Sequence, residues 1–321
     1  SRIARFGEGG AKGSINFDAG KGHVFKIGVG YEWRPPMANT AFISPEICND
    51  YVLNLGDEHV FSSEFSYQYQ NAWVHANVNA YYSRLDHVTE WQNFYNDDEN
   101  SFTYLSMTGI EKEYYGIEAG LDFKVASFLN FKAIGTISDA KNINNANVNY
   151  MLSKSAEVVK DYAYIKDMRE SGTPLTIGSL ALDFHKSGWF VNLNANWYDR
   201  IYLSYSPSYR YKSSLKNRDM LFNDEPLPGS VDQAKGHGGW MVDGSIGKSI
   251  RLKHGSLNFN LMITNILNNR KIVSGGYEQS RSDYTLNKEN EAKDRVYKFS
   301  KNPKKYYVFG TNGMFQVSYR F

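Results

Sequence analysis

One short segment of the sequence combines aromatic and basic side chains in a way that suits ligand binding. Tyr209, Arg210, Tyr211 and Lys212 follow one another within the stretch YSPSYRYKSSLKNR. A tyrosine ring can stack on a ligand or attract a cation, and a guanidinium forms paired hydrogen bonds with a carboxylate or a phosphate. These four residues are therefore predicted to bind substrate, of an anionic kind, from an external loop.

No arrangement of residues in the sequence predicts catalysis. His185 lies beside Ser187, but both fall at an expected turn. His75 and Ser83 are too far apart along one strand to form a nucleophile and its base. The carboxylates at positions 97–99 lack the spacing of an established Ca²⁺ loop. The sequence thus predicts that the protein is not an enzyme and that it uses no metal and no cofactor.

Composition restricts the class of protein. The 321 residues carry a formal net charge of +2, 15% of them are aromatic, and their mean hydropathy is −0.53. The near-neutral charge gives no reason to expect nucleic acid as a partner. No apolar run approaches the roughly 18 residues of a membrane helix. Membrane-spanning β-strands are not excluded, because each has only about 10 alternating residues and is missed by a search for apolar runs.

Alternation of apolar and polar residues is the dominant pattern of the chain. It is strict in EYYGIEAGLDFKV (113–125), and it recurs at residues 23–33, 188–199 and 256–263. These stretches have about 10–14 residues, which fits tilted membrane strands better than the roughly 5–6 residues of soluble strands. Aromatic residues gather at the strand ends, as in the girdles at membrane interfaces. The pattern predicts an all-β, transmembrane, antiparallel up-and-down β-barrel; a soluble sandwich or propeller is the alternative.

In a barrel of this kind, the polar face of each strand is expected to line the lumen. The apolar face then meets outer-membrane lipid, which makes lipid the first expected partner. The polar residues predicted to face the lumen are Glu118, Asp122, Asn192, Asn194, Asn196, Asn258 and Asn260.

The connections between the strands alternate in length. Outer-membrane barrels have short periplasmic turns and long external loops. The sequence therefore predicts the outer membrane of a Gram-negative bacterium, with the long loops extracellular and the C-terminus periplasmic. The short connections lie near residues 19–22, 70–72, 126–128, 186–188 and 253–255, and the long ones near residues 35–57, 86–112, 141–172, 204–238 and 269–311.

The last residues of the chain, MFQVSYRF, alternate on a strand that ends at an aromatic residue. Phe315, Val317, Tyr319 and Phe321 fall on one face. This arrangement resembles the insertion signal of bacterial outer-membrane proteins, so these four residues are predicted to be a barrel-assembly signal.

The number of strands bears on the extent of the barrel. About eleven strands can be counted, whereas bacterial single-chain barrels have even numbers. Eleven is half of the 22 strands of plugged outer-membrane transporters. Residues 1–321 are therefore predicted to be the C-terminal portion of such a barrel, without its plug domain and N-terminal half. The alternative is a missed strand at residues 101–107 or 295–300, which would give a complete barrel of about twelve strands.

Five segments carry a resemblance to a known family. They are YEWRPPMANTAFI (31–43), EHVFSSEFSYQYQNAWVHANVNAYYSRL (58–85), EKEYYGIEAGLDFKV (111–125), ITNILNNRKIVSGGY (263–277) and FQVSYRF (315–321). In this order they resemble the C-terminal barrel half of TonB-dependent outer-membrane receptors of the type abundant in Bacteroidota.

The resemblance implies energised, plug-gated uptake of a nutrient of the siderophore, haem, cobalamin or glycan class. This chain would supply the barrel wall and the external loops that capture substrate. The implied partners are the plug domain and N-terminal barrel half, the TonB energy-transducing complex acting through the parent protein, and a surface lipoprotein of the kind found on glycan-importing relatives. A porin-like or structural barrel of about twelve strands is the alternative, and an outer-membrane enzyme is a weaker one.

Overall fold

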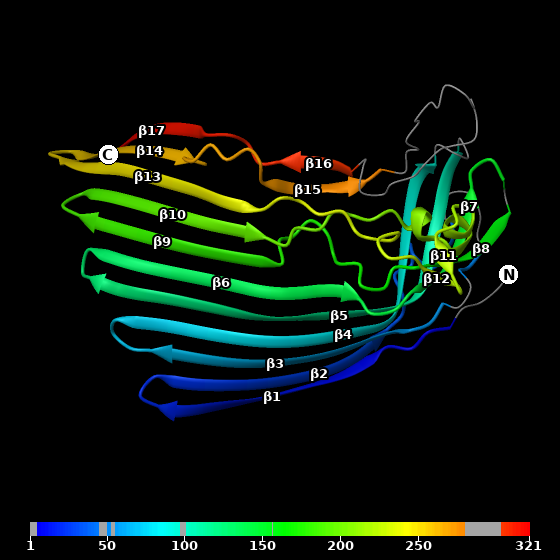
Figure 1. The fold of residues 1–321 in the computed structure, drawn as a ribbon. Helices are drawn as coiled ribbons and strands as arrows, with labels where there is room; N and C mark the ends of the chain where they lie inside the picture. Colours follow the sequence, from blue (N-terminus) through cyan, green and yellow to red (C-terminus); the bar gives the residue numbers. More distant parts are fainter. Residues whose placement is uncertain (1–4, 45–49, 53–54, 97–100, 156, 280–302) are drawn as a thin grey trace, which may run out of the picture.

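The computed structural model describes residues 5–44, 50–52, 55–96, 101–155, 157–279 and 303–321, almost all of them in or beside antiparallel sheet. Eleven strands of this described part pair in the order in which they occur along the chain (Figure 1). The prediction of an antiparallel up-and-down sheet of about eleven strands is therefore confirmed. The strands are β1 (Gly9–Gly20), β2 (His23–Arg34), β3 (Glu58–Gln70), β4 (Val74–Asn96), β5 (Ser101–Ala126), β6 (Leu129–Asn142), β9 (Thr176–Lys186), β10 (Trp189–Asp199), β13 (Gly239–Leu252), β14 (Gly255–Thr264) and β17 (Asn312–Arg320).

Tight turns join the strands at one end of the sheet, seen on the left in Figure 1. Two of these turns depend on glycine. Gly22 and Gly188 have φ angles of 86° and 77°, which favour a residue without a side chain. A Cβ on Gly22 would lie 1.9 Å from the carbonyl oxygen of Gln70, and one on Gly188 would lie 2.5 Å from that of Ser249. The predicted short connections are therefore confirmed, and glycine is required in both of these turns.

The described residues of the longer connections, at the opposite end, form further short strands and helices. They contain the strands β7 (Ala146–Leu152), β8 (Val158–Ala163), β11 (Leu221–Phe222), β12 (Glu225–Pro226), β15 (Val273–Glu278) and β16 (Pro303–Tyr307), with the short helices η1 (Pro207–Arg210) and α1 (Lys212–Lys216). We call these segments, together with the outer parts of β4 and β5, the external assembly.

The prediction of a long loop at residues 86–112 is wrong for most of that range. Strands β4 and β5 continue through it as a paired ribbon, with the register shifting between Leu85 and Glu90. The ribbon persists because its β5 half also pairs with β7, so the backbone is hydrogen-bonded on both sides. The additional strand considered at residues 101–107 belongs to β5 itself, and residues 295–300 lie outside the described residues.

Buried apolar residues are concentrated in the external assembly. Leu105, Met107 and Ile110 of β5 form a cluster with Val148 of β7 and Tyr211, and all five side chains are buried. Within the described residues, no helix has both the length and the apolar character needed to cross a membrane.

The apolar face of the large sheet is exposed along its length. Ile15, Ile27, Ile117 and Ile137 are 74%, 55%, 58% and 66% exposed. The strand register places all four on the same face. A continuous apolar surface of this kind requires an apolar environment, which supports the expectation of contact with lipid.

The two edges of the sheet run in the same direction. In the described part of the chain, β1 pairs only with β2, and β17 pairs only with β14. Gly20, near the end of β1, pairs with His23 at a tight turn, and Arg320, the last residue of β17, pairs with Ser256 beside another tight turn. Both edge strands therefore run toward the rim of tight turns, so pairing them with each other would be parallel.

Candidate functional site

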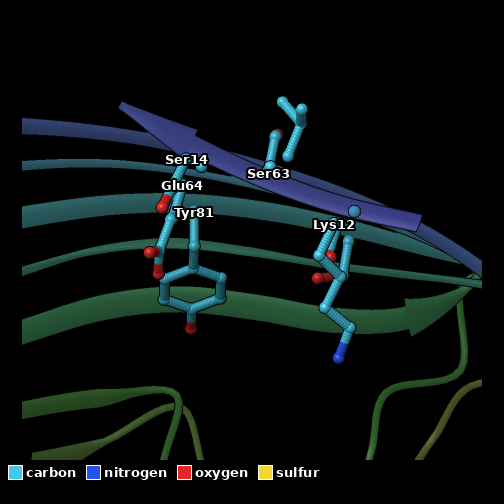
Figure 2. A pocket seen from close by; sticks show the side chains of 11 residues that line it. Lys12, Ser14, Ser63, Glu64 and Tyr81 are labelled. Carbon is cyan, nitrogen blue, oxygen red and sulfur yellow. The ribbon is translucent and has the colours of Figure 1, made fainter. Parts of the chain in front are cut away.

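The seven residues predicted to face the lumen share one face of the sheet. Register along adjacent strands connects them, because Asp122 pairs with Lys132, Asp183 with Asn192, and Asn260 with Gly247. Figure 2 shows Lys12, Glu64 and Tyr81 of this polar face pointing to one side of the sheet, and Ser63 pointing to the other. Contact of these residues with a transported substrate stays a prediction.

The polar face carries a ladder of hydrogen bonds centred on Asp183. Its carboxylate pairs with Lys132 at 3.1 Å and accepts a hydrogen bond from the Asn192 amide. The Asn194 amide donates to the Asn192 carbonyl oxygen at 2.7 Å, and the Ser179 hydroxyl donates to Asn196 at 2.7 Å. Asn192 and Asn196 thus bond to the neighbouring strand β9, Asn194 bonds to Asn192 within β10, and these bonds preorganise the polar face.

A shallow hollow of about 380 Å³ lies on the polar face of β1 to β4 (Figure 2). Gly28 and Gly30 form its floor, and a Cβ on Gly28 would lie 3.1 Å from Cγ of Glu64. Lys26 and Glu64 form an ion pair at 2.5 Å between neighbouring strands. The hollow is therefore lined by glycine backbone together with larger polar side chains such as Lys12, Glu64 and Tyr81.

A second cavity of about 370 Å³ lies where the polar face meets the external assembly. Its central group is the Lys112 ammonium, whose side chain is only 8% exposed. Lys112 donates to Glu170 at 2.6 Å and also pairs closely with Glu90. Two carboxylates around one buried ammonium satisfy its charge and leave further carboxylate oxygens for a ligand.

Aromatic hydroxyls surround this charge cluster. Tyr114 donates to Glu170 at 3.0 Å, and Tyr205 accepts a hydrogen bond from the Asn142 amide at 3.2 Å. Burial raises the pKa of Tyr205, and the neighbouring Glu90 carboxylate raises it further. Tyr205 therefore keeps its proton throughout the physiological range and can act as a hydrogen-bond donor.

In the structure, the four residues predicted to bind an anion do not form one exposed site. Arg210 is fully buried and pairs with Glu278 at 2.6 Å and 3.0 Å, while three backbone carbonyls take its other donors. Tyr209 and Tyr211 are 8% and 5% exposed, and Lys212 pairs with Asp224 at 2.9 Å. A ligand role for the four stays a prediction, but Arg210 is already engaged inside the external assembly.

The residues of the predicted assembly signal lie on the exposed edge strand β17 or just beyond it. Phe315, Val317 and Tyr319 pair with Leu261, Phe259 and Leu257 of β14 and share the apolar face. Phe321 follows the strand and is 99% exposed. Their role in assembly is not tested by this geometry and stays a prediction.

No family model and no curated protein sequence matches the chain. Solved structures do match. The copper transporter OprC aligns with 98% of this chain and 40% of its own, at 13% identity and a TM-score of 0.57. The chain has the fold of part of the OprC barrel.

Two further solved structures agree with this fold. The ferric-catecholate import receptor Fiu of E. coli K12 aligns with 96% of this chain and 34% of its own, at 11% identity and a TM-score of 0.56. The ferric yersiniabactin uptake receptor FyuA of Yersinia pestis aligns with 97% and 37%, at 11% identity and a TM-score of 0.53. The chain therefore spans about two fifths or less of the length of these proteins.

Sequence reasoning did not single out Glu90, Lys112 or Glu170. All three fall at or inside connections that were expected to be loops, and no short motif brings them together. The one available signal was EKE at residues 111–113, where a lysine lies between two acids on an alternating strand. Alternation places Lys112 on the face opposite Glu111 and Glu113, so its partners had to come from elsewhere in the chain.

Proposed function

We propose that this chain is part of the barrel of an outer-membrane uptake receptor in a Gram-negative bacterium. The observation that carries the proposal is a meander of eleven membrane-length strands whose two edges run in the same direction. Likeness in fold to OprC, Fiu and FyuA, described respectively as a transporter, an import receptor and an uptake receptor, supports it.

The direction of the two edge strands determines which further strands can close the barrel. All pairings of the described sheet are antiparallel, so the next strand beside β1 and the next beside β17 must both run away from the tight turns. A second copy in the same membrane orientation would place β17 beside β1 in parallel. An odd number of further strands satisfies both edges, and eleven of them would complete a 22-stranded barrel, the size of plugged outer-membrane transporters.

Each part of the chain has a role in this proposal. The polar face forms one side of the lumen, and the external assembly forms part of the outer surface that captures substrate. The tight turns and the end of β17 face the periplasm. A plug domain and an N-terminal barrel half, supplied by the parent protein, fill and close the barrel, and the TonB complex energises uptake through them.

The first test concerns the parent protein. We would isolate the native outer-membrane protein that contains this sequence and measure its intact mass, with peptide mapping of the region before Ser1. Since the chain covers 34–40% of three receptors of this fold, the expected mass is roughly two to three times 36.6 kDa. A native mass near 36.6 kDa would contradict the proposal and favour a porin-like barrel.

Energised transport requires a separate test. Accumulation of substrate by cells that carry the parent protein should stop when TonB is deleted or when an uncoupler collapses the proton gradient. A passive channel would keep filling the periplasm under both treatments. Continued accumulation would therefore contradict plug-gated uptake even if the barrel proved to have 22 strands.

A further inference from the structure

The cavity around Lys112 has the position and size of a ligand site. Its volume of about 370 Å³ falls within the usual range of roughly 300–1,000 Å³ for small-molecule sites. A neighbouring cavity of about 440 Å³ shares Gln92, Ser204 and Tyr205 with it. The two cavities therefore adjoin along one wall, at the level where the external assembly meets the polar face of the sheet.

The cations of this cavity are already neutralised. Lys112 lies between Glu90 and Glu170. Arg169, the other cation of the described lining, forms a two-point pair with Asp139, at 2.8 Å and 3.1 Å. An anionic ligand would meet carboxylates without a free positive charge, so the site disfavours an anion.

The same cavity presents hydrogen-bonding groups that are not used within the described chain. The side chains of Gln92, Ser171 and Ser204 line it, and none of them forms a hydrogen bond with another described residue. The hydroxyl of Tyr205 accepts from Asn142 and keeps its own hydrogen for another acceptor. Glu90 and Glu170 each use only one carboxylate oxygen on Lys112.

We propose that this cavity binds an uncharged, polyhydroxylated ligand, namely a saccharide. Sugar hydroxyls both donate and accept, so they can donate to the spare oxygens of Glu90 and Glu170 and accept from Gln92 and Tyr205. The lack of a free cation separates this ligand from iron chelates that carry carboxylate groups. The inference rests on the proposed function as a receptor and names the substrate class of its outer site.

The test is a binding measurement on the detergent-purified parent protein. The neutral probes are maltohexaose, cellohexaose, xylohexaose and mannohexaose, backed by an array of neutral glycans. Hexagalacturonate, a chitosan hexamer and ferric citrate serve as anionic, cationic and chelate probes. We expect at least one neutral glycan to bind, and to bind more tightly than every charged probe. Binding of no neutral glycan, or tighter binding of a charged probe, would overturn the proposal.

Two variants connect binding to the cavity. Gln92→Ala and Tyr205→Phe each remove one hydrogen-bonding group and should weaken glycan binding roughly fivefold to tenfold. Gln70→Ala, at the opposite rim, is the matched control and should leave binding unchanged. Because the Gln92 side chain bonds to no other described residue, its removal should not disturb folding, which circular dichroism would check. Unchanged glycan affinity in both cavity variants would place the binding site elsewhere and refute the inference.

The two proposals can fail separately. TonB-dependent accumulation of an iron chelate, unaffected by Gln92→Ala, would refute the saccharide site and leave the receptor function standing. Glycan binding that is weakened in Gln92→Ala, in cells whose glycan accumulation does not depend on TonB, would support the saccharide site and refute energised uptake by the receptor.

Discussion

The buried ion pair between Arg210 and Glu278 is expected to hold the external assembly together, and Glu278→Gln should loosen it. The Glu278 carboxylate accepts four hydrogen bonds, two from the Arg210 guanidinium and one each from the backbone amides of Ser206 and Ala234 at 3.0 Å. Glutamine keeps one acceptor oxygen and places an NH₂ group against donors. It also leaves the buried guanidinium without a counter-charge.

The size of the effect follows from this loss. Removing one member of a fully buried ion pair costs about 3–5 kcal/mol. Since each 1.4 kcal/mol corresponds to about a tenfold change in an equilibrium constant, local opening should become roughly a hundredfold to several thousandfold more frequent. Amide hydrogen exchange measured by mass spectrometry should therefore accelerate by this factor in residues 203–210, 231–236 and 273–278, while the barrel strands keep their protection.

Two controls sharpen this experiment. Asp224→Asn breaks the exposed pair with Lys212 and should leave exchange unchanged, because solvent screens that pair. Arg210→Met combined with Glu278→Leu should recover much of the protection, because apolar groups can replace a buried pair at little cost. Less than a tenfold acceleration in Glu278→Gln would refute the reasoning, as would an acceleration spread evenly over the barrel strands.

Four further predictions concern changes at single residues. Gly247→Ala should block barrel folding, seen as loss of heat-modifiable migration in gels, because its Cβ would lie 2.4 Å from the backbone carbonyl oxygen of Phe259, which belongs to the paired strand β14 and cannot rotate away. Tyr211→Phe should stabilise the external assembly by about 1 kcal/mol in denaturant titrations, because the buried Tyr211 hydroxyl has no partner among the described residues. Burial raises the pKa of Tyr211 well above 10, so the native protein should lose stability above pH 10, where only the unfolded tyrosine ionises, and Tyr211→Phe should reduce this loss. Deleting Phe321 should lower the yield of assembled barrel in outer-membrane fractions, whereas Phe309→Ala, at an exposed external residue, should not.

Much of the sheet could be predicted because the information is local. Each strand shows a period of two in its own sequence. Glycines also occur at turns such as those of Gly22 and Gly188, where the structure has a positive φ. The same alternation sorted polar from apolar faces correctly, as the shared face of Glu118, Asn192 and Asn258 demonstrates. Period-two patterning is a property of consecutive residues, so it can be read without knowing which strands are neighbours.

The prediction for residues 86–112 was wrong because the length of these two strands depends on distant contacts. The outer half of β5 pairs with β7, which is contributed by residues 146–152, and most of its residues are buried. Sequence alternation weakens there, since buried residues occur on both faces of this half of β5. Only the partner strand shows that the segment continues as sheet.

The sequence by itself determined the all-β class, the alternating faces and the side of the sheet on which the long connections lie. Tertiary structure decided the cavity around Lys112, whose partners lie 22 and 58 residues away. It also decided the burial of Arg210 against Glu278, which lies 68 residues away. A buried charge can be paired by any chain segment that folding brings within reach, and sequence separation carries no record of that choice. Alternation, in contrast, is imposed on every strand by the geometry of its own backbone.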